Sequence, residues 1–571
     1  MESMLRLVRD APAGQFLRWA TGSRLLRYPE EEHDFIIPVN YELALSEARK
    51  SEPQTFNSST LSSSDGRSIV RDTTTDDIER SAVDEERTEE KRNVTFVPLE
   101  TEDGLIVIDW YTSDDSENPQ NWPQTKKSLV AFIIFTYTFI VYAGSAIYTS
   151  SEEEVTTVFG VSMTAASLGL SLYVLGYGVG PLVFSPLSEI PSIGRSPVYC
   201  ITMFLFVIIS IPLPMVDNFA GLLVLRFLQG FFGSPCLATG GATMQDLYSH
   251  LYLPFALSVW VTAAYCGPAL GPLISGFAVE KMGWRWSLWE ILWGAGPVFA
   301  IMVVFLPETS APTLLHKRAK RLRKSLGTQN LMSQSEIEQR RLKPMAIAVE
   351  AIIKPLQISV KDPAVLFVQL YTAIVYGIYY SFFEVFPLVY PPIYGFTLGT
   401  IGLVFLCILV ACLLGIASYF AYLWYYLIPR IENGRPMAQE TRLVPALFGC
   451  FGPPIGLFLF GWTANKDIHW IVPTIGITIY AGSAFIVLQC VFVYVPMSYP
   501  MYAASLFAAN DFFRSAMACG SILYARPMFD NLGIGRGISL LGGLSTLGII
   551  GIFLLHQYGS KLRAKSKFAE S

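Results

Sequence analysis

Histidine is scarce in this sequence, and its cysteines form no known motif. The 571 residues include five histidines, each standing alone, and eight cysteines that lie in or beside apolar stretches, with no CxxC pair among them. Metal sites and cysteine–histidine or serine–histidine catalysis need such side chains at defined spacings. The sequence therefore predicts neither a metal site nor an enzyme, and it gives no indication of a cofactor.

Charged residues are also few, at 15% of the chain, and the acidic ones are concentrated near the N-terminus. Of the 46 acidic residues 26 precede Ser128, against 15 of the 41 basic residues. No basic stripe with interleaved aromatic residues occurs, which argues against a nucleic-acid partner. No Walker-type glycine-rich loop with a lysine occurs either, so we do not expect ATP to drive the protein directly.

Apolar residues are abundant. They make up 52% of the chain, and the mean hydropathy of +0.42 is that of a membrane protein. After Lys127 they form twelve runs, each near the roughly 20 residues that cross a hydrocarbon core. The predicted spans are 128–149, 164–184, 197–213, 219–241, 254–276, 286–306, 364–386, 397–424, 443–462, 470–493, 499–525 and 536–557.

The connection 307–363 is the longest between these runs and divides them six and six. Many transporters consist of such repeats, with the substrate path between the two halves. The sequence therefore predicts an all-α polytopic membrane protein with two six-helix bundles. The predicted segments are an amphipathic cytoplasmic segment 1–50, a disordered acidic tail 51–127, the first bundle 128–306, a cytoplasmic loop 307–363, the second bundle 364–557 and a basic cytoplasmic tail 558–571.

Basic residues predict how the spans are oriented. Eleven of them lie in the connection 307–363 and four follow residue 557, whereas the connections expected on the opposite side hold five in total. Because cytoplasmic connections are enriched in lysine and arginine, both termini are expected in the cytoplasm. Arginines and apolar residues in the first 30 positions suit a helix on an acidic membrane surface, or a solvated tail helix. The plasma membrane is the expected location, with the vacuolar membrane as the alternative.

Three short motifs stand in or beside the first six spans. Glu189, Gly194 and Arg195 lie in the connection after the second span, where a carboxylate and a Gly-Arg turn could latch neighbouring helix ends together. Arg226 and Gln229 lie inside the fourth span. A buried arginine costs at least a few kcal/mol unless it is paired or wetted, so Arg226 should face an interior cavity or act as a hydrogen-bonding hub between helices.

The third motif lies in the fifth span. Pro268 removes a backbone donor and bends the helix, while Gly267 and Gly271 allow another helix to approach closely. These three motifs, in this order, resemble the signature motifs of the major facilitator superfamily. Further stretches resemble the fungal twelve-helix drug:proton antiporters, and within them the benomyl and fluconazole resistance exporters: 28–31, 118–123, 189–195, 307–309, 460–463 and 502–505.

This resemblance implies two bundles that alternate between inward-open and outward-open states, with proton entry driving the exit of an amphipathic small molecule. It also implies that Arg226 takes part in proton coupling and that the bend at Gly267, Pro268 and Gly271 favours antiport. A drug, a toxin or a self-made metabolite is the expected cargo, and the protein is expected to act as a monomer in the bilayer. The alternatives are an uptake carrier for a nutrient or polyamine, or a non-transporting sensor with the same fold.

Other ionisable residues fall inside the predicted spans. Glu384 stands among tyrosines and phenylalanines of the seventh span, and Glu290 stands among tryptophans of the sixth. A carboxylate in such a site could bind a proton and release it when a cationic or polar substrate arrives. Asp511 and Arg514, three residues apart in the eleventh span, could pair with each other. These four residues, with Arg226 and Gln229, are the candidates for proton coupling or substrate binding.

Overall fold

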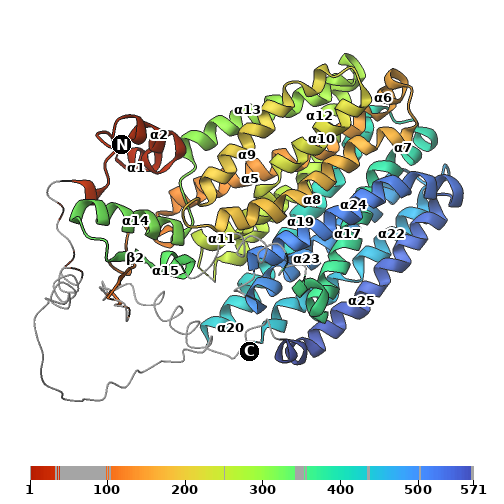
Figure 1. The fold of residues 1–571 in the computed structure, drawn as a ribbon. Helices are drawn as coiled ribbons and strands as arrows, with labels where there is room; N and C mark the ends of the chain where they lie inside the picture. The colour runs from red at the N-terminus through yellow and green to blue at the C-terminus, as the bar shows by residue number, and fades with distance from the viewer. Residues whose placement is uncertain are drawn as a thin grey trace, which may run out of the picture.

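The computed structural model describes residues 2–32, 104–249, 251–340, 357–433, 438–499 and 503–566, with isolated positions between them. Long helices lie side by side in one elongated body, and both chain ends are at the same end of it (Figure 1). We call this the tail end, and the opposite end, where α6 (Glu152–Phe159) lies, the α6 end. Most of the expected disordered tail, residues 51–97, lies outside the described residues.

The first bundle contains six membrane spans, several of them assembled from consecutive helices. The first span reaches Phe159, beyond the predicted residue 149, because α5 continues through a 3₁₀ turn into α6. The elements are α5 (Gln124–Ala146), η3 (Ile147–Ser151), α6, α7 (Met163–Ala166), α8 (Leu168–Glu189), α9 (Arg195–Ser210), α10 (Phe219–Gly233), α11 (Pro235–Leu247), α12 (Leu253–Met282) and α13 (Arg285–Phe305).

The second bundle repeats this plan. Its elements are α17 (Pro363–Tyr394), α18 (Leu398–Val404), α19 (Leu406–Tyr422), the π-helical η5 (Leu423–Leu427), α20 (Ile428–Glu432), η6 (Gln439–Leu443), α21 (Val444–Gly449), α22 (Gly452–Thr463), α23 (Ile471–Ser498), α24 (Ala503–Leu532) and α25 (Ile534–Lys565). Across the described residues eleven spans are long and apolar enough to cross a membrane. The remaining predicted span, the eleventh (499–525), corresponds to α24, whose buried Asn510, Asp511 and Arg514 make it more polar.

A small folded unit, which we call the cap, covers the tail end of the first bundle. Strand β1 (Ile106–Ile108) pairs in parallel with β2 (Leu331–Ser333), and Ile106 and Ile108 pack against α14 (Ala311–Leu326). The remaining cap helices are α1 (Glu2–Asp10), α2 (Pro12–Ala20) and α15 (Gln334–Arg340). Helix α2 packs against α9 and α13.

The cap differs from the expectation for segment 51–127, because residues 104–127 are folded. The reason is tertiary: Asp115 is buried and accepts a hydrogen bond of 2.6 Å from Arg318 of α14. Burial of the Asp115 carboxyl opposes its ionisation, but hydrogen bonds from Arg318 outweigh this effect and hold its pKa below the usual range. The acidic residues of this part of the chain are thus ion-pair partners for the basic connection.

The two bundles touch at both ends and in the middle. At the α6 end, Pro272 of α12 lies against Gly402 of α18. Midway, Gly178 of α8 faces Ser515 of α24, and a Cβ atom at Gly178 would collide with it. At the tail end, the Ser258 hydroxyl donates to Gln489 Oε1 over 3.4 Å. Small residues therefore allow the bundles to approach closely along their boundary.

Candidate functional site

Tyrosine hydroxyls join the two bundles at the centre of the boundary. The hydroxyl groups of Tyr177 and Tyr376 are 2.7 Å apart, and Tyr177 also donates to the Tyr380 hydroxyl over 2.9 Å. The Ser145 hydroxyl lies 2.9 Å from the same Tyr380 oxygen. Tyr177 and Ser145 belong to the first bundle and the two others to α17. We call these four residues the tyrosine bridge; all of them are buried.

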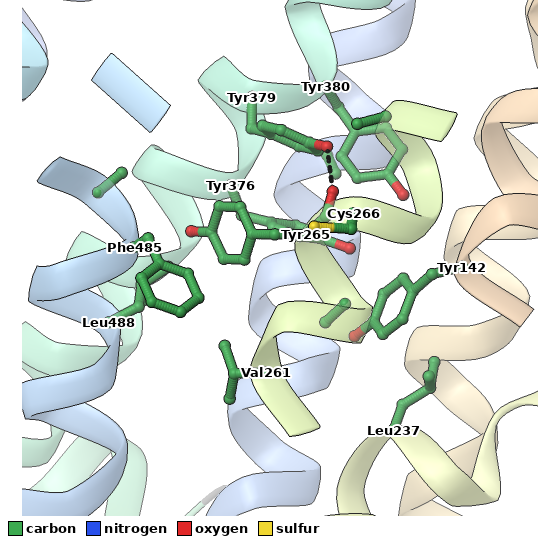
Figure 2. Packing of buried hydrophobic residues seen from close by; sticks show 14 of the residues in the cluster. Tyr142, Leu237, Val261, Tyr265, Cys266, Tyr376, Tyr379, Tyr380, Phe485 and Leu488 are labelled. Carbon is green, nitrogen blue, oxygen red and sulfur yellow. Dashed lines mark hydrogen bonds between the residues drawn. The ribbon is translucent and has the colours of Figure 1, made fainter. Parts of the chain in front are cut away.

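More aromatic side chains surround the tyrosine bridge. Figure 2 shows Tyr376, Tyr379 and Tyr380 of α17 facing Tyr265 of α12 and Tyr142 of α5. The Tyr379 hydroxyl donates to the Tyr265 carbonyl over 2.9 Å, a second hydrogen bond between the bundles. The centre of the molecule is thus packed with aromatic rings and hydroxyl groups, side chains whose chemistry suits planar apolar compounds with a few polar atoms.

Arg226 is completely buried in the first bundle, where it links three helices. It donates to the carbonyls of Gly144 at 2.9 Å, Ser145 at 3.0 Å and Gly169 at 3.1 Å, and to Gln229 Oε1 at 3.1 Å. Gly144 and Ser145 lie in the last turn of α5, just before the 3₁₀ turn η3, and their carbonyl oxygens accept from the guanidinium. These contacts are those of a hub between helices.

The Arg226 hub is connected to the tyrosine bridge. The guanidinium donates to the Ser145 carbonyl, and the Ser145 hydroxyl contacts Tyr380 of the second bundle. Gln229 extends the hub to α9, because its Nε2 donates to Ser210 Oγ over 2.7 Å. A change in the position of Arg226 would therefore displace Ser145 and alter its contact with Tyr380 at the boundary between the bundles.

Asp511 and Arg514 pair within α24, with 2.5 Å between Oδ1 and Nη2. Both are buried, and α24 lies against α8 at the boundary. The Arg514 guanidinium lies 4.8 Å from the centre of the Tyr376 ring and contacts the Tyr142 side chain. The structure thus brings this pair beside the tyrosine bridge.

Glu384 of α17 lies near a second acid, which sequence reasoning missed. Glu384 and Glu152 are 2% and 5% exposed, and they interact electrostatically. The Ser167 hydroxyl donates to Glu152 Oε2 over 3.1 Å and also lies beside the Glu384 carboxylate. Glu152 begins the run Glu152–Glu154, three residues beyond the predicted end of the first span, and so falls in a predicted connection. An acidic run next to a span was the available signal.

Glu290 does not lie with Glu384 and Glu152. It is half-buried on α13, which packs against α5, α9 and α12 of its own bundle. Gly267 and Gly271 also face inside the first bundle: a Cβ atom at either would lie within 3 Å of α5 or η3. They allow α12 to pack closely on its neighbour, next to Pro268.

The residues of the predicted latch gather at the tail end of the first bundle. Arg195 pairs with Asp246 at the end of α11, with 2.5 Å between Nη1 and Oδ2, and it also interacts electrostatically with Glu189. The Glu308 carboxylate accepts from the backbone N–H of Arg195 at 3.1 Å. Gly194 has a φ of +83°, and a side chain there would collide with Glu308. The latch therefore joins α8, α9, α11 and the start of the central connection.

A family model for the Major Facilitator Superfamily matches residues 133–522. The chain belongs to the major facilitator superfamily. It is 43% identical to the MFS-type transporter pyvG of Aspergillus violaceofuscus, over 99% of this chain and 100% of the relative. It is 37% identical to the cycloheximide resistance protein of Candida maltosa, over 99% and 100%. It is 39% identical to fluconazole resistance protein 1 of Saccharomyces cerevisiae, over 81% and 85%.

Solved structures of the superfamily have the same fold. The proton:xylose symporter XylE superposes with a TM-score of 0.53 at 15% identity, over 76% of this chain and 96% of that one. A peptide transporter POT bound to sulfate gives 0.54 at 15% identity, over 78% and 98%. By its family match and its relatives the chain is a multi-pass membrane transporter of the superfamily and not an enzyme, as the sequence predicted.

Proposed function

We propose that this chain exports amphipathic small molecules in exchange for protons, by alternating access between its two bundles. The observation that carries the proposal is the tyrosine bridge, which joins the bundles through hydroxyl groups and ring faces. A neutral hydrogen bond contributes only about 1 kcal/mol net, so a bound substrate can replace several of them. Relatives named for resistance to fluconazole and cycloheximide support export and an amphipathic cargo.

Separation of the bundles turns this boundary into a binding surface. When the hydroxyl pairs of Tyr177 with Tyr376 and Tyr380 open, the rings become a lining on which planar or cationic groups stack. The Asp511–Arg514 pair then adds charge close to that lining. Arg226 keeps its fixed charge on the carbonyls of the first bundle and transmits movement through Ser145.

Protons supply the energy in this proposal. The chain lacks a glycine-rich lysine loop for ATP, and buried carboxylates stand at the bundle boundary. Both termini lie in the cytoplasm, because the connections at the tail end carry most of the basic residues, and the α6 end then faces outward. The plasma membrane is the proposed location, and a monomer is the proposed transporting unit, since each chain carries both halves of the path.

The test is transport of radiolabelled fluconazole and cycloheximide into everted vesicles from a pump-deficient yeast that expresses the chain. Acidification of the vesicle lumen should drive accumulation, and a protonophore should abolish it while ATP is held constant. Vesicles from cells that carry an empty vector are the control. Accumulation that persists without a pH gradient would contradict proton coupling, and drug movement out of acidified everted vesicles would contradict export.

A further inference from the structure

Two buried carboxylates from different bundles meet near the α6 end. Glu152 is the first residue of α6 in the first bundle, and Glu384 lies on α17 of the second. Ser167, at the start of α8, contacts both. In each carboxylate one oxygen is buried without a hydrogen-bond partner. Because α6 and α17 belong to bundles that separate during transport, this contact exists only while the α6 end is closed.

Glu152, Glu384 and Ser167 together offer too few hydrogen-bond donors for two ionised carboxylates. The Ser167 hydroxyl has one proton, so it can serve only one carboxylate at a time. In the part of the chain that the structure describes, neither carboxylate has a lysine, arginine or histidine nitrogen within 4.0 Å. Arg226 of α10 and Arg526 of α24 act on the pair only from a distance. A second buried negative charge would remain uncompensated, which disfavours the doubly ionised pair.

We propose that Glu152 and Glu384 hold one proton between them and that this shared proton clamps the α6 ends of the bundles together. With one proton the pair carries a single negative charge and can form a charge-assisted O–H···O⁻ hydrogen bond. Without it, two negative charges repel each other, and water enters as the bundles part. The inference rests on the proposed exchange of drug for protons and names the residues that bind the exchanged proton.

The clamp gives the transport cycle its order. If the α6 end faces outward, a proton that enters from outside closes this end after the drug has left, and its loss permits the next opening. From Glu384 toward the tail end, Tyr380 and Tyr376 lie one and two turns further along α17. The Tyr177 hydroxyl contacts the hydroxyl groups of both tyrosines. The clamp therefore stands at one end of a buried row of hydroxyl groups that leads to the centre of the boundary.

The experiment measures closure of the α6 end without a substrate. Spin labels carried by non-canonical residues replace Thr157 of α6 and Lys466, which follows α22, because both are exposed and belong to different bundles. Pulsed electron resonance then gives the distance distribution of the full-length chain in lipid nanodiscs between pH 5 and pH 9. The variants are Glu152→Gln, Glu384→Gln and the double variant, each checked for its melting temperature.

In the unsubstituted chain we expect one short distance at low pH and a growing population of longer distances as the pH rises. Glu384→Gln and Glu152→Gln remove the second charge, so the longer population should fall at least fivefold at pH 9, and the double variant should add little. Glu153→Gln is the matched control, because Glu153 is the exposed neighbour of Glu152 on α6. It should follow the unsubstituted chain.

Two results would overturn the clamp: distances in the unsubstituted chain that do not depend on pH, or single variants that retain its pH response. These results are distinguishable from failure of the proposed function. If protonophores abolish drug transport but the spin-label distances do not change when Glu152 or Glu384 is replaced, proton coupling stands and another group carries the proton. If the distances depend on pH only while Glu152 and Glu384 are both present, but transport does not depend on the proton gradient, the clamp stands and the exchange mechanism fails.

Discussion

The cap and the boundary between the bundles both contain buried polar side chains, but different interactions hold them. In the cap, guanidinium groups pair with carboxylates, as in Arg318 with Asp115 at 2.6 Å and Arg18 with Glu31 at 2.7 Å. At the boundary, side-chain hydrogen bonds join mainly neutral hydroxyl groups, such as those of Tyr177 and Tyr376. Among the ion pairs between described residues, none crosses from one bundle to the other.

This difference separates what is fixed from what moves. Charge-assisted hydrogen bonds are roughly twice as strong as neutral ones, so the ion pairs hold the segments of the cap to one another more firmly than the hydroxyl pairs hold the two bundles together. Neutral hydrogen bonds of about 1 kcal/mol can be exchanged for bonds to substrate or water at little cost. The boundary is therefore built to open, and the cap is built to stay closed.

The largest expected effect comes from the Arg226 hub. Arg226→Ala leaves the carbonyls of Gly144, Ser145 and Gly169 buried without their donor, at a cost of about 1–3 kcal/mol for each group. We expect transport of every substrate to fall at least 100-fold and the melting temperature to fall. Drug efflux at matched surface expression checks this, and Arg226→Lys should restore only part of it, because lysine lacks the planar fork. Normal efflux in Arg226→Ala would contradict the hub.

The next effect concerns the cap. Arg318→Ala removes the partner of the buried Asp115 carboxylate, while Arg321 still pairs with Glu30 and Glu117. Residues 104–121 should therefore become accessible to protease. Deletion of 51–115 removes β1 and Asp115 altogether, so the remaining residues 116–121 should become accessible as well.

Deletion of 51–97 is the matched control for the cap. It leaves β1 and the cap ion pairs between described residues intact, so protection of residues 104–121 should be unchanged and efflux should stay within a few-fold of normal. Limited proteolysis and efflux measured on the same preparations check both statements. Complete loss of efflux in this deletion, at normal surface expression, would show that segment 51–97 is itself needed for transport, contrary to this prediction.

A smaller effect is expected at the boundary. Tyr177→Phe removes the hydroxyl that contacts Tyr376 and Tyr380 but keeps the ring. With about 1 kcal/mol for each hydrogen bond, kcat/KM should change by no more than about 30-fold, and the fold should be retained. Transport kinetics in vesicles measure this. An effect as large as that of Arg226→Ala would mean that the boundary is as rigid as the cap.

The smallest effect is a pH response confined to acid. Hydrogen bonds from Arg318 and Arg18 outweigh burial and lower the pKa values of Asp115 and Glu31. An acid whose pKa is lower in the folded state stabilises that state fully above its unfolded value, near 4, and the contribution is lost as the pH falls through the lower folded value. Hydrogen exchange of residues 104–121, corrected for intrinsic rates, should therefore be constant from pH 5 to pH 8 and rise in stronger acid. Loosening between pH 5 and pH 8 would contradict this account.

Much of the fold was predictable because a bilayer imposes simple rules. The length and hydropathy of each run identified the spans, and Arg226 stood out as a charge inside an apolar helix. The cap was not predictable, because β1 pairs with a strand more than 200 residues away. Glu152 was missed for the same reason: its position opposite Glu384 depends on how two bundles pack, which no local pattern specifies.

The pairing of β1 with β2 also constrains the order in which this protein can be assembled. Ribosomes synthesise Ile106–Ile108 before the first span, but the partner Leu331–Ser333 only after the sixth. The cap can therefore close only when six spans have been made and both strands have remained on the same side of the membrane.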